Sequence, residues 1–212
     1  MSQPEERGTR REQILAAAMA VFARKGFDQA SMDDIPTEAG LSKGGVYWHF
    51  KSKEEMILAI LDQLFQQDLA RLAAVQGDGE PVMERLRRLL DFALEDVRRL
   101  ADLQALSVSF YAAALFQEPV RQELRGYLRQ YRALLEALIQ QGIERGEFGD
   151  LSAQAAALAF MAQFEGLILL WMIDPEQIDL PAMAHYALTL LERAFRATSA
   201  DTATSSTAAL SS

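Results

Sequence analysis

The sequence has 212 residues, half of them hydrophobic and 24% charged, and this composition favours a folded chain with one large or two small cores. It contains no cysteine, which excludes disulfides, thiolate metal sites and cysteine nucleophiles. The two histidines, His49 and His185, are too far apart in sequence to form a spaced ligand pair, so we expect no metal and no other cofactor. The N-terminus lacks the apolar segment of a signal peptide, which favours a cytoplasmic protein.

The formal net charge of −9 is unevenly distributed along the chain. Residues 1–53 carry eight basic and seven acidic side chains, and every lysine of the chain falls there. The remaining residues carry 13 basic and 23 acidic side chains, a net charge of −10. Such asymmetry is typical of a segment that binds a polyanion and is joined to an acidic body.

Three short helices are predicted in the first segment. Apolar residues recur at helical spacing in Arg10–Lys25, and Gly26 follows as a stop signal. A second helix is predicted in Ser31–Ala39, where a capping hydroxyl precedes an acidic residue by three positions. A glycine-containing turn leads to a third helix that Ser42 can cap. The second and third helices therefore form a helix-turn-helix.

The stretch Leu41–Lys53 contains the third helix and is the most informative part of the sequence. A helix of about seven residues is marginal in water, so its neighbours must hold it. Val46 and Phe50 are expected to point inward, which leaves a basic and aromatic surface outside. Gly44 and Gly45 in the first turn each cost about 1 kcal/mol relative to alanine. Close approach of the helix N-terminus to phosphate is one reason for them, and a flexible turn is the alternative.

These residues resemble the DNA-binding domain of the TetR (tetracycline repressor-like) family of bacterial transcription regulators. The resemblance is carried by an ordered set of positions within residues 9–53, namely Thr9, Arg10, Ile14, Leu15, Ala17, Ala18, Phe22, Gly26, Phe27, Ser31, Met32, Ile35, Ala39, Gly40, Ser42, Lys43, Gly44, Tyr47, Trp48, His49, Phe50, Ser52 and Lys53. It implies an all-helical dimer of about nine helices. Three N-terminal helices would bind operator DNA, and a C-terminal helical domain would bind a small effector.

Pro36 departs from the family pattern, which usually has alanine there. If Ser31 caps the second helix, Pro36 is its fifth residue and removes one backbone hydrogen bond, to Met32. Proline at such an interior position costs about 3 kcal/mol. The residue therefore argues against a regular second helix and affects the expected orientation of the third.

Candidate DNA contacts fall into two groups, because side chains in the major groove read bases whereas cations and N–H groups bind phosphates. Lys43 and Tyr47 are the candidates for base edges, with Gly44 allowing the helix to lie deep in the groove. The candidates for phosphate contacts, in line with where the family contacts the DNA backbone, are Thr9, Ser42, Trp48, His49 and Lys53. The alternatives are that Tyr47 and Trp48 pack against the first helix and that His49 is only a surface residue.

The rest of the chain is predicted to form a helical body. Its helices are expected over Lys53–Val75, Pro81–Val97, Asp102–Phe116, Pro119–Gly146, Ala155–Ile173 and Pro181–Arg196. We therefore predict a helix-turn-helix DNA-binding domain at 1–53 and a helical effector-binding and dimerisation domain at 54–197. Residues 198–212 are rich in alanine, serine and threonine and are predicted to be disordered.

The segment Ala155–Ile173 is apolar nearly all round and raises the question of a membrane span. Glu165 near its middle would cost about 2.5 to 3.5 kcal/mol on insertion. A helix buried both inside the monomer and against a partner subunit explains the pattern better. The family commonly forms its dimer through the last two helices, and the residues expected at that interface are Ala155, Ala159, Ala162, Gly166, Ala187, Leu190, Leu191 and Ala194.

The effector site is less visible in the sequence. Ligand pockets are mostly apolar with a few polar groups. The candidates in the body are Phe110, Tyr111, Phe116, Tyr131, Phe164, Glu165 and Trp171. The alternative for the aromatic residues is ordinary core packing. The carboxylate of Glu165 needs a partner, which is either a hydrogen-bonding group in the core or across the dimer, or a cationic effector.

The predicted function is that of a ligand-responsive DNA-binding transcription regulator, a repressor released from a palindromic operator by a small-molecule effector. The rival hypothesis is an all-helical ligand-binding protein or enzyme that has the fold without the DNA role, favoured by the acidic body and Pro36. The sequence shows no nucleophile-base or metal constellation, so we expect no enzyme. The operator, the effector and the choice between repression and activation stay open.

Overall fold

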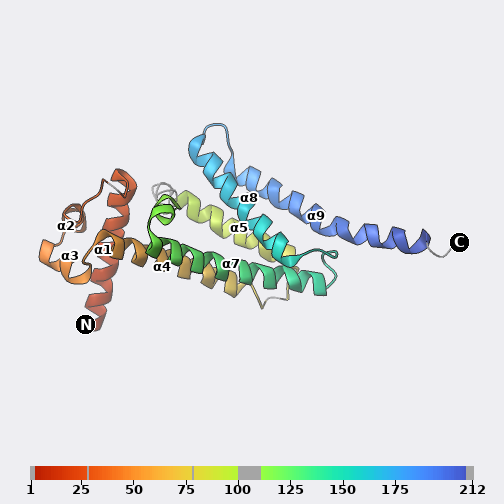
Figure 1. Ribbon diagram of the computed structural model, residues 1–212, viewed down its shortest axis with the longest axis horizontal. Coiled ribbons are helices and arrows are strands. Elements are labelled where there is room, and N and C mark those ends of the chain that lie inside the picture. Colours follow the sequence, from red (N-terminus) through yellow and green to blue (C-terminus); the bar gives the residue numbers. More distant parts are fainter. Residues whose placement is uncertain (1–2, 28, 78, 100–110, 209–212) are drawn as a thin grey trace. The chain divides into compact units, whose positions relative to one another are not determined.

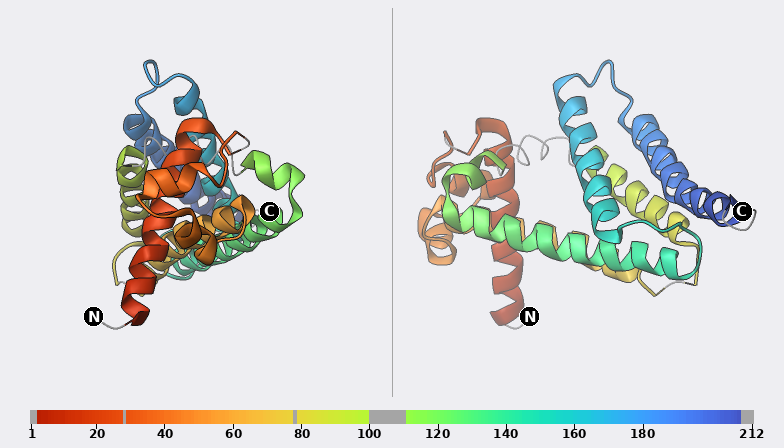
Figure 2. Two further views of the ribbon diagram at one scale, coloured as in Figure 1. Left: turned by 90° about the vertical axis from the view of Figure 1, so that its left-hand side faces the viewer. Right: turned by 45° about the vertical axis from the view of Figure 1, so that its right-hand side comes forward.

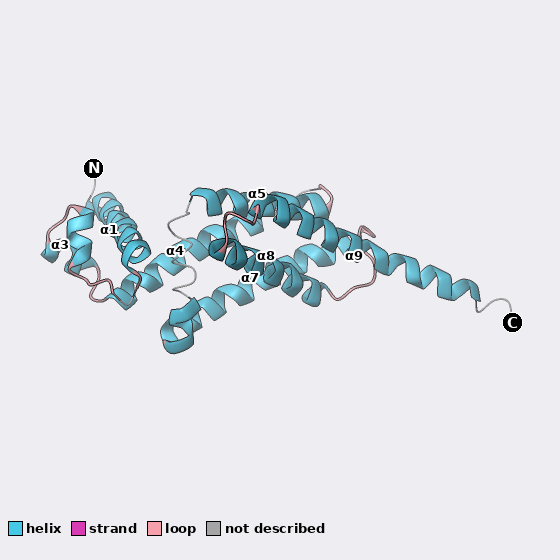
Figure 3. Cartoon of the chain, turned by 90° about the horizontal axis from the view of Figure 1, so that it is seen from above, coloured by secondary structure: helices cyan, strands magenta, loops and turns pink. Residues whose placement is uncertain are grey.

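The computed structural model describes residues 3–27, 29–77, 79–99 and 111–208, and describes side chains within 9–196 except at 28, 78 and 96–110. In these residues the chain is all-helical, as predicted, with helices joined by loops and no strand (Figures 1 and 3). The helices are α1 (Gln3–Lys25), α2 (Asp34–Ala39), α3 (Lys43–His49), α4 (Lys53–Ala74), α5 (Val82–Arg99), α7 (Glu118–Glu144), α8 (Ala153–Ile173) and α9 (Leu180–Ala208). Residues 111–116 are also helical, and the rest of the predicted helix at Asp102–Phe116 lies outside the described residues.

Contacts within the chain separate it into two compact units. Unit 1 comprises Met1–Asp68 and Val97–Tyr127, and unit 2 comprises Leu69–Asp96 and Leu128–Ser212. The division therefore falls inside α4, α5 and α7, whereas the sequence placed a domain boundary after residue 53. A helix start is a local signal that the sequence shows, but a unit boundary depends on which distant residues are in contact.

The N-terminal head, formed by α1 to α3 in unit 1, has a single apolar core. The apolar stripe predicted for α1 is buried, and Ile35, Val46 and Phe50 from the other two helices are buried as well. Figure 2 shows α2 and α3, in orange, packed with α1, in red. Gly26 and Gly40 end α1 and α2 with φ angles of 77° and 64°, a left-handed conformation that glycine adopts without a steric cost.

The first helix begins at Gln3. The sequence analysis had predicted a start at Arg10. The apolar stripe that marks the buried part of α1 starts only at Ile14, so periodicity gave no signal for the earlier turns. Pro4 is tolerated in a first helical turn because its missing N–H has no acceptor there.

The second helix also starts at a different residue, and this removes the expected cost of Pro36. α2 begins at Asp34 with Asp33 as its N-cap residue, so Pro36 is its third residue. The first four N–H groups of any helix lack an intrahelical acceptor, and proline there removes no hydrogen bond. The prediction that Pro36 disrupts an interior position was therefore wrong. Ser31 instead donates from its backbone N–H and its hydroxyl to Asp34 Oδ2, at 2.9 Å each.

Arg85 of α5 is a fully buried charged side chain in unit 2, with an exposed fraction of 0%. Its guanidinium donates to the carbonyl oxygens of Val75 and Gln76 and, at 3.0 Å, to Gln141 Oε1 of α7. Val75 and Gln76 directly follow the last residue of α4, so Arg85 binds the carbonyl groups at that helix C-terminus. A cation is favoured at this negative end of the helix dipole.

The last helix continues past the predicted end near Arg196. α9 extends to Ala208, so most of the segment expected to be disordered, 198–212, is helical in the structure. The sequence beyond Arg196 contains neither glycine nor proline, and alanine has the highest intrinsic helix propensity.

Candidate nucleic-acid interface and internal cavity

The third helix has the cap and the length predicted for it. Ser42 is the N-cap residue of α3, and its hydroxyl oxygen accepts from the Gly45 N–H at 3.2 Å. A Cβ atom at Gly44 would meet no other atom within 4 Å. Packing inside the protein therefore does not require glycine at 44, and since the residue is helical, a flexible turn does not explain it either.

The outer side of α3 carries the basic and aromatic side chains that the sequence placed there. Val46 and Phe50 are buried, whereas Tyr47 is 38% exposed and Trp48 is 59% exposed. His49 is half-buried, and its ring stands nearly perpendicular to that of Trp48 with centroids 4.6 Å apart. Trp48 is therefore not a core residue of unit 1.

Lys43, the first residue of α3, pairs with an acidic residue that the sequence reading had not considered. Its Nζ lies 2.8 Å from Asp33 Oδ2, and both side chains are exposed. The hydrogen bond with the Asp33 carboxylate raises the pKa of Lys43 above its usual value. No periodicity or spacing signals this contact, because Asp33 lies outside α3 in the turn before α2.

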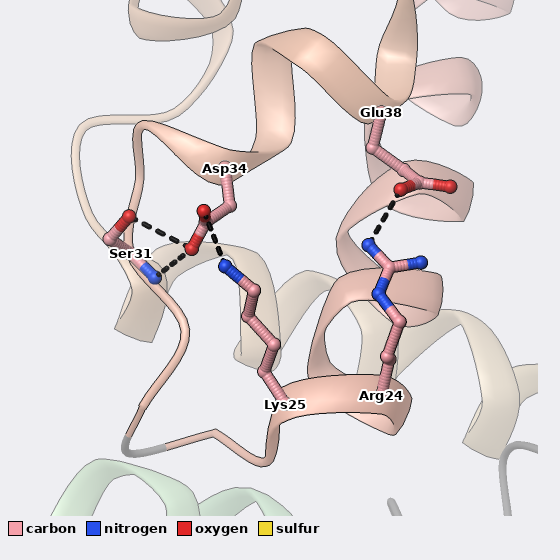
Figure 4. A network of polar contacts seen from close by, with 5 residues as sticks. All are labelled: Arg24, Lys25, Ser31, Asp34 and Glu38. Atoms are coloured by element: carbon pink, nitrogen blue, oxygen red, sulfur yellow. Dashed lines mark hydrogen bonds and ion pairs between the residues drawn. The ribbon is translucent and has the colours of Figure 1, made fainter.

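Two further ion pairs join α1 to α2 (Figure 4). Lys25 Nζ lies 2.7 Å from Asp34 Oδ1, and Arg24 Nη2 lies 2.8 Å from Glu38 Oε2. The hydrogen bond from Lys25, followed by those from Ser31, lowers the pKa of Asp34 to about 2. The acidic side chains of the α2 region thus pair with cations of the head.

Two of the predicted phosphate-contact residues lie differently from what the sequence indicated. Thr9 is exposed but sits inside α1, so its backbone N–H is within the helical hydrogen-bond pattern and only the side chain is presented. Lys53 is half-buried: its ammonium donates to the Phe27 carbonyl at 2.8 Å and lies 4.8 Å from the centre of the Phe27 ring. Lys53 therefore has a contact inside the head that a helix-face argument could not foresee.

Unit 2 contains a small, mostly apolar cavity between α5, α8 and α9. Its volume is about 20 Å³, and it is lined by Leu90, Phe160, Gln163, Phe164, Leu167, Ala184, Ala187, Leu188 and Leu191. Gln163 supplies the polar group: its Oε1 is buried and has no hydrogen-bond partner among the residues that the structure describes. A buried amide oxygen without a partner costs free energy, so a hydrogen-bond donor placed there would be stabilised.

Only one of the predicted effector residues lines this cavity, namely Phe164. Phe116 is 86% exposed and Tyr111 is 39% exposed, whereas Phe110 lies outside the described residues. Glu165 is exposed on α8. The two remaining candidates are half-buried and do not line the cavity: Tyr131 and Trp171. The sequence analysis did not identify Gln163 as a cavity residue, because a single amide on a helix that is apolar all round gives no indication of the direction in which its side chain points.

The outer face of α8 and α9 exposes a large number of apolar side chains. Five predicted interface residues are exposed on it, namely Ala155, Ala159, Ala162, Leu190 and Ala194, while Gly166 is half-buried. The larger residues exposed on these two helices, which the sequence analysis had not named, are Leu158, Leu169, Leu170, Ile173, Met183 and Tyr186. Ala187 and Leu191 instead line the cavity, so for these two the packing lies within the unit.

By length and composition α8 is the one described helix that could cross a membrane, and only 17% of its apolar window is buried inside the structure. The sequence had predicted that this helix is buried both inside the monomer and against a partner subunit. The structure shows the burial inside the monomer, where Ala153, Ala156, Ala157 and Phe160 are buried. The exposed apolar area of the outer face exceeds what single scattered surface residues would give, which is typical of an interaction surface.

Comparison with known proteins finds a matching protein-family model for both the N-terminal and the C-terminal part of the chain. Residues 14–60 match the model of bacterial regulatory proteins of the tetR family, and residues 82–196 match that of the BetI-type transcriptional repressor C-terminal domain. YfiR of Bacillus subtilis, an uncharacterized HTH-type transcriptional regulator, is 31% identical over 196 residues, covering 91% of this chain and 95% of its own. The HTH-type transcriptional regulator TtgR of Pseudomonas putida is 28% identical over 182 residues, covering 83% of this chain and 86% of its own.

Solved structures show the same fold. The complex of SmeT with triclosan aligns with a TM-score of 0.78 at 23% identity, over 88% of this chain and 91% of SmeT. SmeT is the repressor of a multidrug efflux pump of Stenotrophomonas maltophilia. The matched relatives are transcription regulators, which removes the rival hypothesis of an enzyme. With both halves matched and a relative above 30% identity along nearly its whole length, the chain belongs to the TetR family and is a DNA-binding transcription regulator, not an enzyme.

Proposed function

We propose that this protein is a repressor that binds a palindromic operator as a homodimer and releases it when a small molecule binds to unit 2. The observation that carries the DNA role is the outer side of α3, a capped short helix with exposed Lys43, Tyr47 and Trp48. A helix of this kind fits the major groove, and its free N-terminal N–H groups attract phosphate.

The side chains of the head divide between the bases and the DNA backbone. Lys43 and Tyr47 reach base edges, and Gly44 lets the helix approach closely because it presents no Cβ. Phosphates are bound by the Ser42 hydroxyl, Trp48 and His49, with Thr9 contributing its side chain. The ammonium of Lys53 adds a further phosphate contact.

A gel-shift measurement tests this function directly. The full-length protein is titrated against the DNA upstream of its own gene and against a scrambled duplex of the same length, at several salt concentrations. We expect a specific complex that persists at moderate salt and weakens linearly in log[salt], with a slope of about −0.9 for each phosphate neutralised. Equal affinity for the two duplexes would contradict the proposal.

The proposed dimer forms through the outer face of α8 and α9. The small residues Ala155, Ala159 and Ala162 permit close approach of two helices, and the larger exposed apolar residues around them supply the area to be buried. Glu165 in the middle of this face disfavours a lipid environment, because a central acidic residue costs about 2.5 to 3.5 kcal/mol on insertion. We therefore propose a cytoplasmic dimer in which the two heads reach successive major-groove faces, about 34 to 36 Å apart.

The proposed effector enters the cavity of unit 2. The lining contains no charged side chain among the described residues, so the ligand is uncharged where it contacts the protein. The cavity of about 20 Å³ holds little more than one water molecule, so a ligand must displace side chains of α8 or α9. That displacement gives the ligand different affinities for two conformations, which is what a population shift requires.

Gln163 provides a test of the effector site. We expect Gln163→Leu to lower the affinity for a ligand with a hydroxyl or N–H donor about 3- to 10-fold, because one hydrogen bond is lost. The affinity for a ligand without a donor should not change. The measurement is ligand-induced release of operator DNA, using pairs of aryl alcohols and the corresponding aryl ethers. Gln130→Leu on the exposed side of α7 is the control. An equal response of both variants to both ligands would place the effector elsewhere.

A further inference from the structure

Asp33 occupies an unusual position in the head. It is the N-cap residue of α2, yet its side chain makes no capping hydrogen bond. Its carboxylate instead lies 2.8 Å from the ammonium of Lys43 at the start of α3. A capping role therefore does not account for the carboxylate, and the contact that it does make is with a residue of the recognition helix.

The other two acidic residues of the α2 region serve the fold of the head. Asp34 accepts from Ser31 and pairs with Lys25, which fixes the turn before α2 to the end of α1. Glu38 pairs with Arg24 of α1. Of these three carboxylates, Asp33 is the one bonded to α3, and its side chain is more exposed than that of either of the other two.

An exposed carboxylate beside a lysine that contacts bases changes the affinity for different DNA sequences by different amounts. A phosphate must compete with Asp33 for the ammonium and is also repelled by the carboxylate, whose charge has the same sign. Guanine presents two acceptors, O6 and N7, to an ammonium in the major groove and carries no charge there. The carboxylate thus opposes a phosphate contact of Lys43 more than it opposes a guanine contact.

We propose that Asp33 is a specificity-determining residue, which holds the Lys43 ammonium in the free protein and so lowers affinity for non-operator DNA more than for the operator. This inference rests on the proposed contact of Lys43 with base edges. Lys43 leaves Asp33 when base acceptors replace the carboxylate, and on other sequences it stays paired. Asp33 itself needs no contact with DNA for this effect.

The test compares Asp33→Asn with Glu38→Gln, since each removes one negative charge and one ion pair from the same short segment. Affinities for the operator and for a scrambled duplex are measured by fluorescence anisotropy over a range of salt concentrations. We expect Asp33→Asn to strengthen scrambled-duplex binding by up to about 5-fold for each head, and so up to about 25-fold for a dimer, with a smaller gain on the operator. The salt slope on the scrambled duplex should steepen by about 0.9 for each head.

A third variant shows whether the effect passes through Lys43. In a Lys43→Met background, Asp33→Asn should no longer change the ratio of the two affinities beyond what Glu38→Gln does. The inference is overturned if Asp33→Asn and Glu38→Gln change both affinities alike, or if the effect of Asp33→Asn persists without Lys43. Thermal unfolding of each variant verifies that the head is folded.

The wild-type protein separates this inference from the proposed function. If the wild type prefers the operator and the Asp33 variant does not lower that preference, only the role of Asp33 is wrong. If the wild type fails to distinguish the two duplexes, the proposed repressor function fails as well.

Discussion

Replacing Arg85 by methionine should lower the free energy of unfolding by about 3 kcal/mol or more. The substitution keeps much of the buried volume but leaves the carbonyl oxygens of Val75 and Gln76 and the Gln141 side-chain oxygen without their donor. Each buried acceptor without a partner costs about 1 to 3 kcal/mol, and the relief of the buried charge offsets part of this. Denaturant unfolding at one fixed protein concentration measures the change, because the stability of a dimer depends on concentration.

Arg87 on the same helix provides the matched control. Its side chain is 35% exposed and pairs with Glu84 and Glu192. Ion pairs of this kind contribute about 0 to 1 kcal/mol, so Arg87→Met should cost no more than that. If the two variants lose equal amounts of unfolding free energy, the hydrogen bonds of Arg85 at the end of α4 do not contribute to stability.

Replacing Ala162 by arginine should separate the proposed dimer and lower operator affinity about 10²- to 10⁴-fold. Ala162 is exposed on the outer face of α8, so the monomer can accommodate the larger side chain, whereas a helix of a partner subunit cannot approach it closely. A dimer binds its second half-site at the high effective concentration set by the first, and a monomer loses this advantage. Analytical ultracentrifugation measures the mass, and fluorescence anisotropy measures the affinity.

Gln130→Arg on α7 controls for the added charge, since Gln130 is exposed and lies outside the outer face of α8 and α9. This variant should remain dimeric and should bind the operator as well as the wild type or slightly better, because DNA attracts the added cation. A dimeric Ala162→Arg variant would show that the subunits meet through another surface.

The sequence was most informative about local structure. Apolar periodicity marked the buried stripe of α1 because a helix that covers a core must repeat its apolar residues every three or four positions. The cap at Ser42 and the inward positions of Val46 and Phe50 follow from the same short-range rules, and the structure confirms them. In the first turns of α1 and the last turns of α9 periodicity carried no signal, and the helices extend beyond the predicted ends.

The register of the second helix shows how a local rule can mislead. Ser31 and Asp34 have the spacing of a capping box, but Ser31 donates to Asp34 before the helix begins, and the helix starts two residues later than a cap at Ser31 predicts. Pro36 consequently occupies a first-turn position that proline tolerates. Two starting points two residues apart differ little in local energy, so contacts with α1 decide between them.

The amino-acid sequence by itself determined the all-helical class, the recognition helix and its outward display of Lys43, Tyr47 and Trp48. These depend on the order of residues within one or two helical turns. Only the tertiary structure decided the pairing of Lys43 with Asp33, the burial of Arg85 at the end of α4, and the position of Gln163 in the cavity. Each of these joins side chains from different elements, and the free energy of such a contact depends on distance and burial, which no single stretch of sequence specifies.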